Sequence, residues 1–165
     1  MGWTVYGFRV TKYDPRLRDD RGRFLGDEWT SSSDVGRSFG GAVLRMEGYT
    51  ETEAAYLEAI RLFARDSSVR ELRVREFEPG QDGKGPDHVR SGARLSLDES
   101  IDVAQHVLRE HFWCKLEDDD RFRVHFGYDY YMYIESACDC GRAIQEVRAS
   151  GLFVEPDFRS PYGRH

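Results

Sequence analysis

Residues 112–135 constrain the fold most, because apolar and polar residues alternate through three short runs of this segment. Such alternation is typical of β-strands that bury one face and solvate the other. Two groups of turn-forming residues, 117–120 and 127–129, separate the three runs. The pattern therefore predicts a three-stranded antiparallel meander in the C-terminal half of the chain.

The pairing of the predicted strands follows from their apolar residues. If Leu116 pairs with Phe122 and Phe126 with Tyr130, one face collects Phe112, Cys114, Leu116, Phe122, Val124, Phe126, Tyr130, Met132 and Ile134. Burying each side chain contributes about 1.5–3 kcal/mol, and a slip of one residue would turn the whole set to solvent. We expect this face to lie in the core.

The same pairing predicts three rows of side chains on the opposite face. They are Trp113, His125 and Tyr131; Lys115, Arg123 and Tyr133; and Glu117, Arg121 and Glu135. The third row is a set of cross-strand ion pairs that stabilises the sheet. The first two rows gather aromatic and cationic side chains, which are residue types enriched at binding hot spots.

Two interpretations of this aromatic and cationic face remain open. A helix packed on it would bury the rings and leave the cations to reach solvent at the rim. An uncovered face would instead be a binding surface formed by Trp113, Arg123, His125, Tyr131 and Tyr133, suited to a protein partner or to stacking on bases. The placement of the helices decides between the two.

Local patterns predict the rest of the fold. Alternation predicts strands over residues 3–13, 69–77 and 152–154. Capping boxes at Thr50 and Ser96 predict helices over 50–65 and 96–111, and Asp139 is the expected cap of a third helix over 139–149. This order predicts an α+β fold, with a mainly antiparallel sheet of about five or six strands and three helices packed on it.

We expect residues 1–165 to form a single domain with flexible loops over 15–30 and 78–95 and an extended tail over 156–165. The first loop holds Asp27, Glu28 and Trp29. These residues are either part of a solvated loop or a contact surface, anchored by the Trp ring and facing a basic partner.

The composition indicates an acidic, folded protein. Of the 165 residues, 13% are aromatic and 33% are charged, which is typical of a packed core inside a well-solvated surface rather than of disorder. The formal net charge of −6 is opposite in sign to that of most nucleic-acid-binding domains. It favours a basic partner, most simply a protein.

The three cysteines and the absence of a leader or a long apolar run predict a cytoplasmic protein without membrane attachment. Cys138 and Cys140 are either soft metal ligands or small apolar fillers. His106 and His111 would lie about 140° apart on one helix, so they are not expected to converge on a metal. We expect no metal and no cofactor.

The signals for catalysis are local and few. His125, with Asp129 and Tyr131, would form an acid–base cluster if the strands bring the three together, whereas a lone histidine on a strand is usually structural. The chain contains no nucleophile elbow, phosphate loop or dinucleotide fingerprint.

These features favour a non-enzymatic protein-binding module, such as an inhibitor, an immunity protein or an antitoxin, that neutralises a basic partner such as a nuclease. The first alternative is a binder of nucleotides or single-stranded nucleic acid, with Arg121 and Arg123 on the phosphates. The second alternative is a small enzyme that uses His125, Asp129 and Tyr131.

Overall fold

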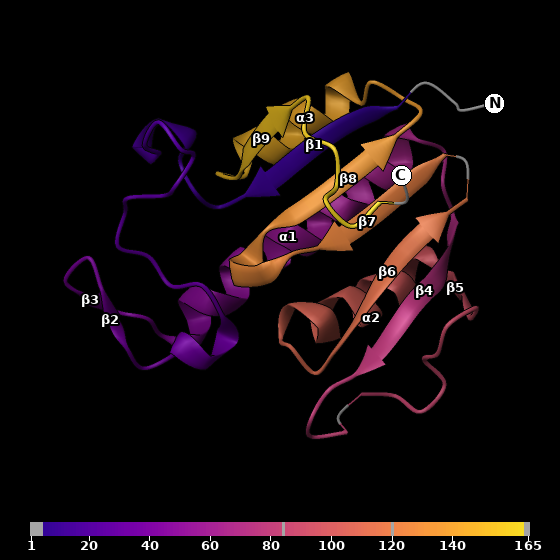
Figure 1. Ribbon diagram of the computed structural model, residues 1–165, viewed down its shortest axis with the longest axis horizontal. Helices are drawn as coiled ribbons and strands as arrows, with labels where there is room; N and C mark the ends of the chain where they lie inside the picture. The colour runs from indigo at the N-terminus through magenta and orange to yellow at the C-terminus, as the bar shows by residue number, and fades with distance from the viewer. Residues whose placement is uncertain (1–4, 84, 120, 164–165) are drawn as a thin grey trace.

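In the computed structural model, which describes residues 5–83, 85–119 and 121–163, seven strands form one antiparallel sheet. The strand order is β5-β4-β6-β7-β8-β1-β9. Figure 1 shows the helices behind the sheet, so the molecule has two layers. The predicted α+β fold is confirmed, with one strand beyond the expected range.

The main sheet contains β1 (Tyr6–Thr11), β4 (Glu71–Pro79), β5 (Arg94–Ser96), β6 (Phe112–Asp118), β7 (Phe122–Phe126), β8 (Met132–Ser136) and β9 (Phe153–Pro156). The helices are α1 (Met46–Asp66), α2 (Leu97–Leu108) and α3 (Gly141–Ala149). A hairpin of β2 (Ser38–Phe39) and β3 (Ala42–Val43) and the 3-10 turns η1 (Pro15–Leu17), η2 (Ser32–Asp34) and η3 (Tyr128–Tyr130) complete the described structure.

The meander is present, but its pairing differs from the predicted one by two residues. Leu116 lies opposite Val124, and Phe126 lies opposite Met132. A shift of two keeps every side chain on its own face, so burial does not distinguish between these registers. The position of the turn selects the observed register, because β6 continues through the acidic run as far as Asp118. Tyr130 is buried as expected, although it lies in η3 rather than in a strand.

All three helices bury their apolar residues against the apolar face of the sheet. Tyr56 and Phe63 of α1, Val103 of α2, and Ala143 and Val147 of α3 belong to the same core cluster as the inward side chains of the meander. The opposite face is turned toward the viewer in Figure 1, and no helix of the described chain lies on it. The interpretation in which a helix covers the polar face is therefore wrong.

The starts of the helices match the predicted caps only in part. At α2, Ser96 and Glu99 form the predicted capping box, each side chain accepting a hydrogen bond from the other residue's amide. Helix α1 starts at Met46 instead of Thr50, whose hydroxyl donates to a carbonyl inside the helix. Met46 and Glu47 favour a helix, and the first turn forms there although it includes Gly48, a poor helix former. Cys140, not Asp139, is the N-cap of α3.

The predicted flexible loop over 78–95 is shorter than expected. Strand β4 runs to Pro79, and the chain returns to pair with it as β5 from Arg94. Val89, between the two strands, is buried. The loop thus adds the edge strand that the sequence did not predict. No helix in the described chain is both long and apolar enough to cross a membrane.

A buried carboxylate joins α1 to the end of α2. Glu53, whose side chain is 2% exposed, accepts two hydrogen bonds of 2.8 Å from Arg109, one of 2.7 Å from Gln105 and one of 2.8 Å from Tyr49. Burial opposes the ionisation of Glu53, but these hydrogen bonds together outweigh it and lower its pKa. Glu53 is therefore ionised at neutral pH and depends on Arg109 for its counter-charge.

Replacing Arg109 with Met should lower the free energy of unfolding by about 3 kcal/mol, because it leaves a buried carboxylate without its cation. Arg61→Met is the matched control, since it removes an exposed ion pair with Asp98 and should cost less than about 1 kcal/mol. Urea unfolding followed by circular dichroism measures both. Equal losses in the two variants would contradict this account.

Candidate functional site

The polar face of the sheet carries a row of charged residues, one from each of five adjacent strands. In spatial order they are Arg94, Arg73, Glu117, Arg123 and Glu135. Arg123 lies 3.2 Å from Glu135 and 3.7 Å from Glu117. The predicted row of Glu117, Arg121 and Glu135 is wrong in its middle member, because the two-residue shift puts Arg123 there and leaves Arg121 in the turn.

His125 lies beside this row and is fully buried. Its Nε2 is 2.7 Å from Glu117 Oε2, and its Nδ1 is 2.5 Å from Ser160 Oγ. Serine, histidine and a carboxylate in a hydrogen-bonded chain are residue types of nucleophilic catalysis. Ser160, however, is 3% exposed, and its hydroxyl also accepts the Tyr162 amide. The chain of hydrogen bonds ties down the C-terminal residues and offers no nucleophile to solvent.

Residues 157–163, here called the C-terminal strap, cross the polar face in front of β7 and β8 (Figure 1). Glu135 accepts hydrogen bonds from the Ser160 amide at 2.8 Å and from Arg159 at 3.1 Å. The Lys115 ammonium donates to the Tyr162 carbonyl. Burial opposes the ionisation of Glu135, but hydrogen bonds from Ser160, Arg159 and Arg123 lower its pKa. The strap therefore covers much of the face that the sequence predicted to be open or under a helix.

Tyr131 and Tyr133 are both covered by other parts of the chain. Tyr131 stacks on Tyr13 with ring centroids 5.3 Å apart, and its hydroxyl accepts a 2.7 Å hydrogen bond from Arg18. Tyr133 contacts the ring of Tyr162 in the strap, with centroids 6.4 Å apart. The predicted rows thus do not form one continuous aromatic platform.

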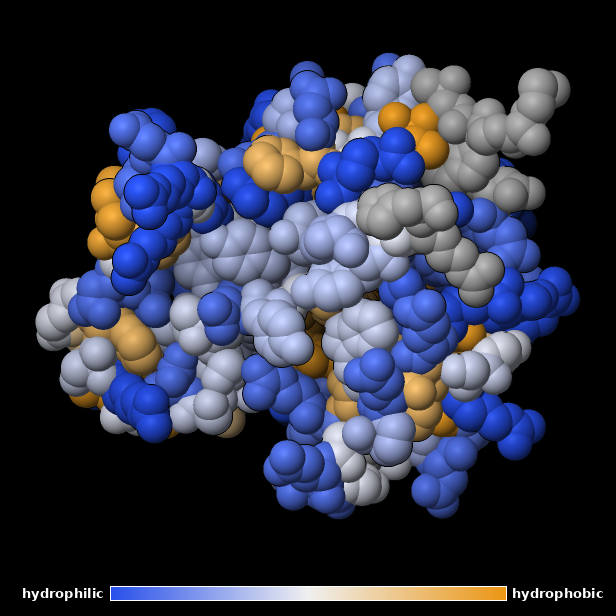
Figure 2. Space-filling model, in the orientation of Figure 1, coloured by the Kyte–Doolittle hydropathy of each residue, from blue (hydrophilic) through white to orange (hydrophobic). Residues whose placement is uncertain are grey.

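Trp113 lies in an open cleft of about 560 Å³ at the end of the meander. The aromatic residues of its lining are Phe112, Trp113, Phe126, Tyr128 and Tyr162. The Trp113 indole donates a 2.8 Å hydrogen bond to the Phe126 carbonyl and meets the edge of Tyr162 at 5.7 Å. Tyr128 is 86% exposed. Figure 2 shows a hollow near the middle of this face, with hydrophobic side chains at its floor.

Two carboxylates stand at the rim of this cleft. Glu78 at the end of β4 and Glu110 after α2 are both exposed, and neither carboxylate forms a hydrogen bond or ion pair with another described residue. None of the described lining residues is basic. Aromatic rings attract a cation through their faces, and carboxylates pair with it directly. The cleft is therefore chemically suited to a guanidinium or ammonium group.

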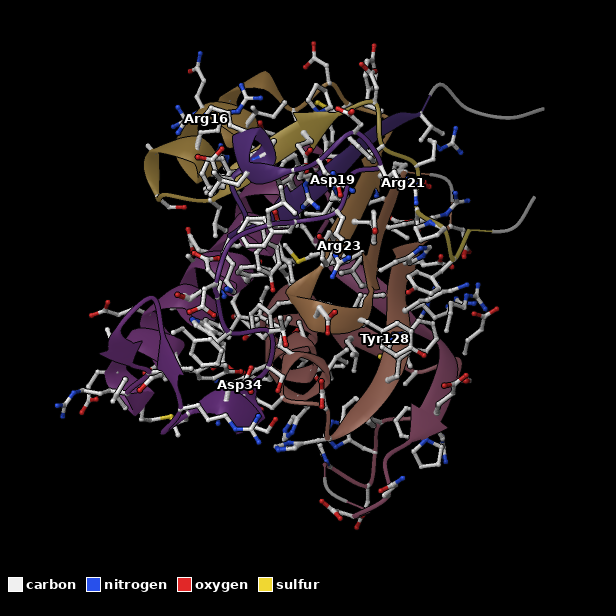
Figure 3. The ribbon with its side chains drawn as sticks, turned by 60° about the vertical axis from the view of Figure 1, so that its left-hand side comes forward. Arg16, Asp19, Arg21, Arg23, Asp34 and Tyr128 are labelled. Carbon is white, nitrogen blue, oxygen red and sulfur yellow. The ribbon has the colours of Figure 1, made fainter. Side chains whose placement is uncertain are left out.

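Asp27, Glu28 and Trp29 lie outside the cleft. The Asp27 carboxylate accepts the Gly40 amide, Glu28 pairs with Lys12 at 3.2 Å, and the Trp29 ring packs on the rings of Tyr49 and Tyr130. Figure 3 shows the more charged part of the same loop, with Arg16, Asp19, Arg21 and Arg23 labelled, and Tyr128 at the β7–β8 turn. The loop residues do not join Trp113 in one site.

The cluster of His125, Asp129 and Tyr131 is not assembled. The hydrogen-bond partners of His125 are Glu117 and Ser160, and the Asp129 carbonyl accepts the hydroxyl of Tyr13 instead. No structural observation therefore connects these three residues in one catalytic role.

Among the described residues, the cysteines and histidines do not gather into a metal site. The Cys140 amide donates to the Cys138 sulfur at 3.3 Å, and both thiols are free. His106 and His111 do converge, with Nδ1 atoms 2.8 Å apart, because α2 ends at Leu108 and His111 belongs to the following turn. Within the described ranges, no three His, Cys, Asp or Glu side chains are arranged to hold a metal ion.

The sequence predicted Trp113 but missed the residues that surround it. Tyr128 stood in an expected turn, Tyr162 in an expected tail, and Glu78 and Glu110 at element ends far apart in the chain. A signal was present in the Gly127-Tyr128-Asp129 turn, because Tyr is a residue type enriched at binding hot spots. Comparison with protein-family models, curated proteins and solved structures gave no match, so the chemistry of the cleft carries the functional argument.

A substitution at Gly7 tests whether the strap is held by its close contact with β1. A Cβ at Gly7 would lie 2.2 Å from the Phe158 carbonyl oxygen, so Gly7→Ala should push the strap away from the sheet. Amide hydrogen exchange at Phe158 and Ser160 should become faster as a result. Gly48→Ala is the control, because its Cβ would meet only Leu44, at 3.9 Å. Unchanged exchange in Gly7→Ala would show that the strap is not held at this contact.

Glu135 makes the attachment of the strap depend on pH. Its pKa in the folded protein lies below the ordinary 4.5, so its ionised form stabilises the fold above that pH, and the contribution is lost as the pH falls through the lowered pKa. Glu135→Gln should therefore destabilise the protein most at neutral pH and progressively less in acid. Urea unfolding across this pH range measures the difference, and a difference independent of pH would contradict the assignment.

Proposed function

We propose that this chain is a non-enzymatic protein-binding module that captures a basic side chain of its partner in the cleft formed around Trp113, Tyr128 and Tyr162. The observation that carries the proposal is the combination of this aromatic lining with the free carboxylates of Glu78 and Glu110. Trp and Tyr are the residues that most often dominate protein-binding energies.

The partner is proposed to be a basic protein such as a nuclease, and the role to be that of an inhibitor, an immunity protein or an antitoxin. The net charge of −6 supports this proposal, because it attracts a basic partner over a distance and speeds the encounter. The cleft then supplies specificity, since a guanidinium inserted between Tyr128 and Trp113 would stack on the rings and pair with the rim carboxylates.

Binding of single-stranded nucleic acid has less support from the polar face. Arg123 is paired with Glu135 and Arg121 with Asp118, and the strap lies over the ring of Tyr133. A nucleic-acid platform needs free cations beside open rings. Arg121, Arg123 and Tyr133, the residues expected to hold the phosphates and a base, are already engaged with the rest of the chain.

The proposal predicts that a short arginine-rich peptide binds the cleft. In titrations of the ¹⁵N-labelled protein with tetra-arginine, the Trp113 indole signal should shift in a saturable way. Glu78→Gln with Glu110→Gln should weaken binding by about tenfold or more, because two charge-assisted contacts are lost. Tyr128→Ala should weaken it by a similar factor with little effect on folding, since Tyr128 is 86% exposed.

The matched control is Glu47→Gln with Glu51→Gln, which removes the same charge from exposed positions on α1. It should leave the Trp113 shift and the affinity nearly unchanged. If the control weakens binding as much as the cleft variant does, the peptide responds to net charge alone and the cleft is not the binding site.

A further inference from the structure

The charge row on the polar face ends in two arginines. Glu117, Arg123 and Glu135 alternate in sign, but at the edge of the sheet Arg73 of β4 lies directly opposite Arg94 of β5. Directly opposed like charges destabilise a sheet. Neither of these two guanidinium groups forms a hydrogen bond or an ion pair with any described residue. Both guanidinium groups act on Asp119 only through space, where with Arg75 they help to lower its pKa. One carboxylate is thus shared among three arginines at this edge.

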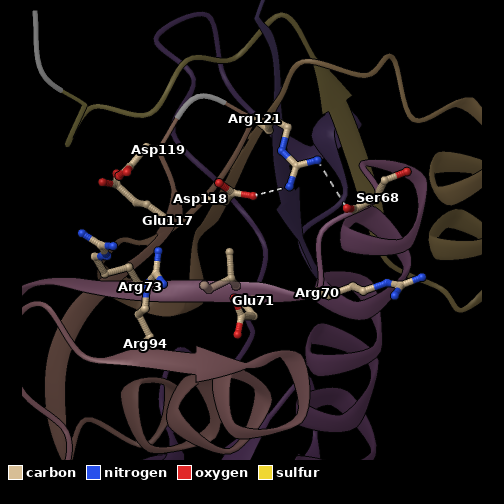
Figure 4. A pocket seen from close by; sticks show the side chains of 10 residues that line it. Ser68, Arg70, Glu71, Arg73, Arg94, Glu117, Asp118, Asp119 and Arg121 are labelled. Atoms are coloured by element: carbon tan, nitrogen blue, oxygen red, sulfur yellow. Dashed lines mark hydrogen bonds and ion pairs between the residues drawn. The ribbon is translucent and has the colours of Figure 1, made fainter.

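The two arginines line a cavity of about 530 Å³ together with Arg70 and Arg121 (Figure 4). In Figure 4 the side chains of Arg73 and Arg94 lie next to each other and rise from the two strands toward the β6–β7 turn. Arg121 is fixed at the other side of the cavity by Asp118, at 2.7 Å. The cavity is thus walled by guanidinium groups on two sides.

The carboxylates around this cavity are largely committed elsewhere. Asp119 pairs with Arg75 at 2.7 Å, and Glu117 accepts a hydrogen bond from His125 and lies 3.7 Å from Arg123. Glu71 is the exception, as it lies opposite Ser96 without a cation of its own. Arg73 and Arg94 both face the cavity without a contact partner, whereas Arg70 points away from it (Figure 4). Because Asp119 is already paired with Arg75, this side of the cavity has a positive excess.

We propose that this cavity binds a phosphate group, as free phosphate or as the phosphoryl end of a small phosphomonoester, between Arg73 and Arg94. A phosphate carries about −1.5 to −2 charges and several acceptor oxygens, enough to engage both guanidinium forks. Placed between the two strands, it restores the alternation of charge along the row. A carboxylate, with one charge, would leave one of the two arginines unmatched. The remaining volume of the cavity accommodates the organic group of a monoester.

The test is a titration of the ¹⁵N-labelled protein with inorganic phosphate and, separately, with phenyl phosphate, at constant ionic strength. The Nε–H signals of Arg73 and Arg94 should shift in a saturable way. Arg73→Gln with Arg94→Gln should weaken binding by about tenfold or more, because charge-assisted hydrogen bonds are removed. The control is Arg21→Gln with Arg23→Gln, which changes the net charge equally at exposed loop positions and should leave binding intact.

Tighter binding of phenyl phosphate than of inorganic phosphate identifies a monoester as the preferred form, and equal binding identifies the free anion. The melting temperature of the double variant tests the effect of the two arginines on stability, independently of binding. In phosphate-free buffer its melting temperature should equal or exceed that of the parent, because the like-charge contact is gone. Shifts that do not saturate, equal losses in the control, or a lower melting temperature of the double variant would each overturn the proposal.

Discussion

Because the three helices all pack on one face of the sheet, the charged side chains of the other face have to neutralise one another. A charge taken out of water is strongly destabilising unless a counter-charge and hydrogen bonds accompany it. The register meets this condition by placing Arg123 between Glu117 and Glu135. The rest of the polar face depends on this arrangement, because it fixes where the buried carboxylates lie and which further hydrogen-bond donors they require.

The C-terminal strap supplies hydrogen-bond partners that the sheet itself does not provide for Glu135 and His125. Glu135 is satisfied only when the Ser160 amide and Arg159 join Arg123 around it, and His125 is satisfied only when Ser160 lies against its ring. The glycine at position 7 lets the strap approach the backbone of β1 closely enough to make these bonds. A segment without regular secondary structure thereby covers part of this face of the sheet, as a second layer of helices does in other proteins.

Two places on the described polar face have charged side chains without a contacting counter-charge. Near one end of β4, Glu78 stands with Glu110 beside exposed rings, and near the other end Arg73 faces Arg94. These two sites carry opposite charge and lie along the same strand, so they suit different ligands: a basic side chain at the aromatic cleft and a phosphate group at the arginine cavity. Between them, Lys115, Arg123 and Glu135 are engaged with neighbouring strands or with the strap.

Much of the architecture could be predicted from the sequence, because alternation fixes which side chains share a face. The inward set from Phe112 to Ile134 and the capping box at Ser96 followed from local pattern alone. The pairing partners did not, since a shift of two residues leaves burial unchanged and only the length of the turn after Asp118 separates the registers.

The candidate site was less predictable for the same reason. Trp113 could be named because it stands on the polar face of a strand, whereas Glu78, Glu110 and Tyr162 reach it from distant parts of the chain through tertiary packing. The strap could not be foreseen from its own composition. Its partners are Glu135, His125 and Lys115, whose need for hydrogen bonds becomes visible only once the sheet is assembled.

The most direct test of the account is to purify the tagged full chain from its own cells at low and high salt and compare bound proteins between wild type and a variant that combines Glu78→Gln, Glu110→Gln and Tyr128→Ala. A stoichiometric basic protein should accompany the wild type and the Glu47→Gln, Glu51→Gln control, and should be lost from the cleft variant. Retention of every bound protein by the cleft variant, with its fold intact, would contradict the central claim that this cleft is the recognition site.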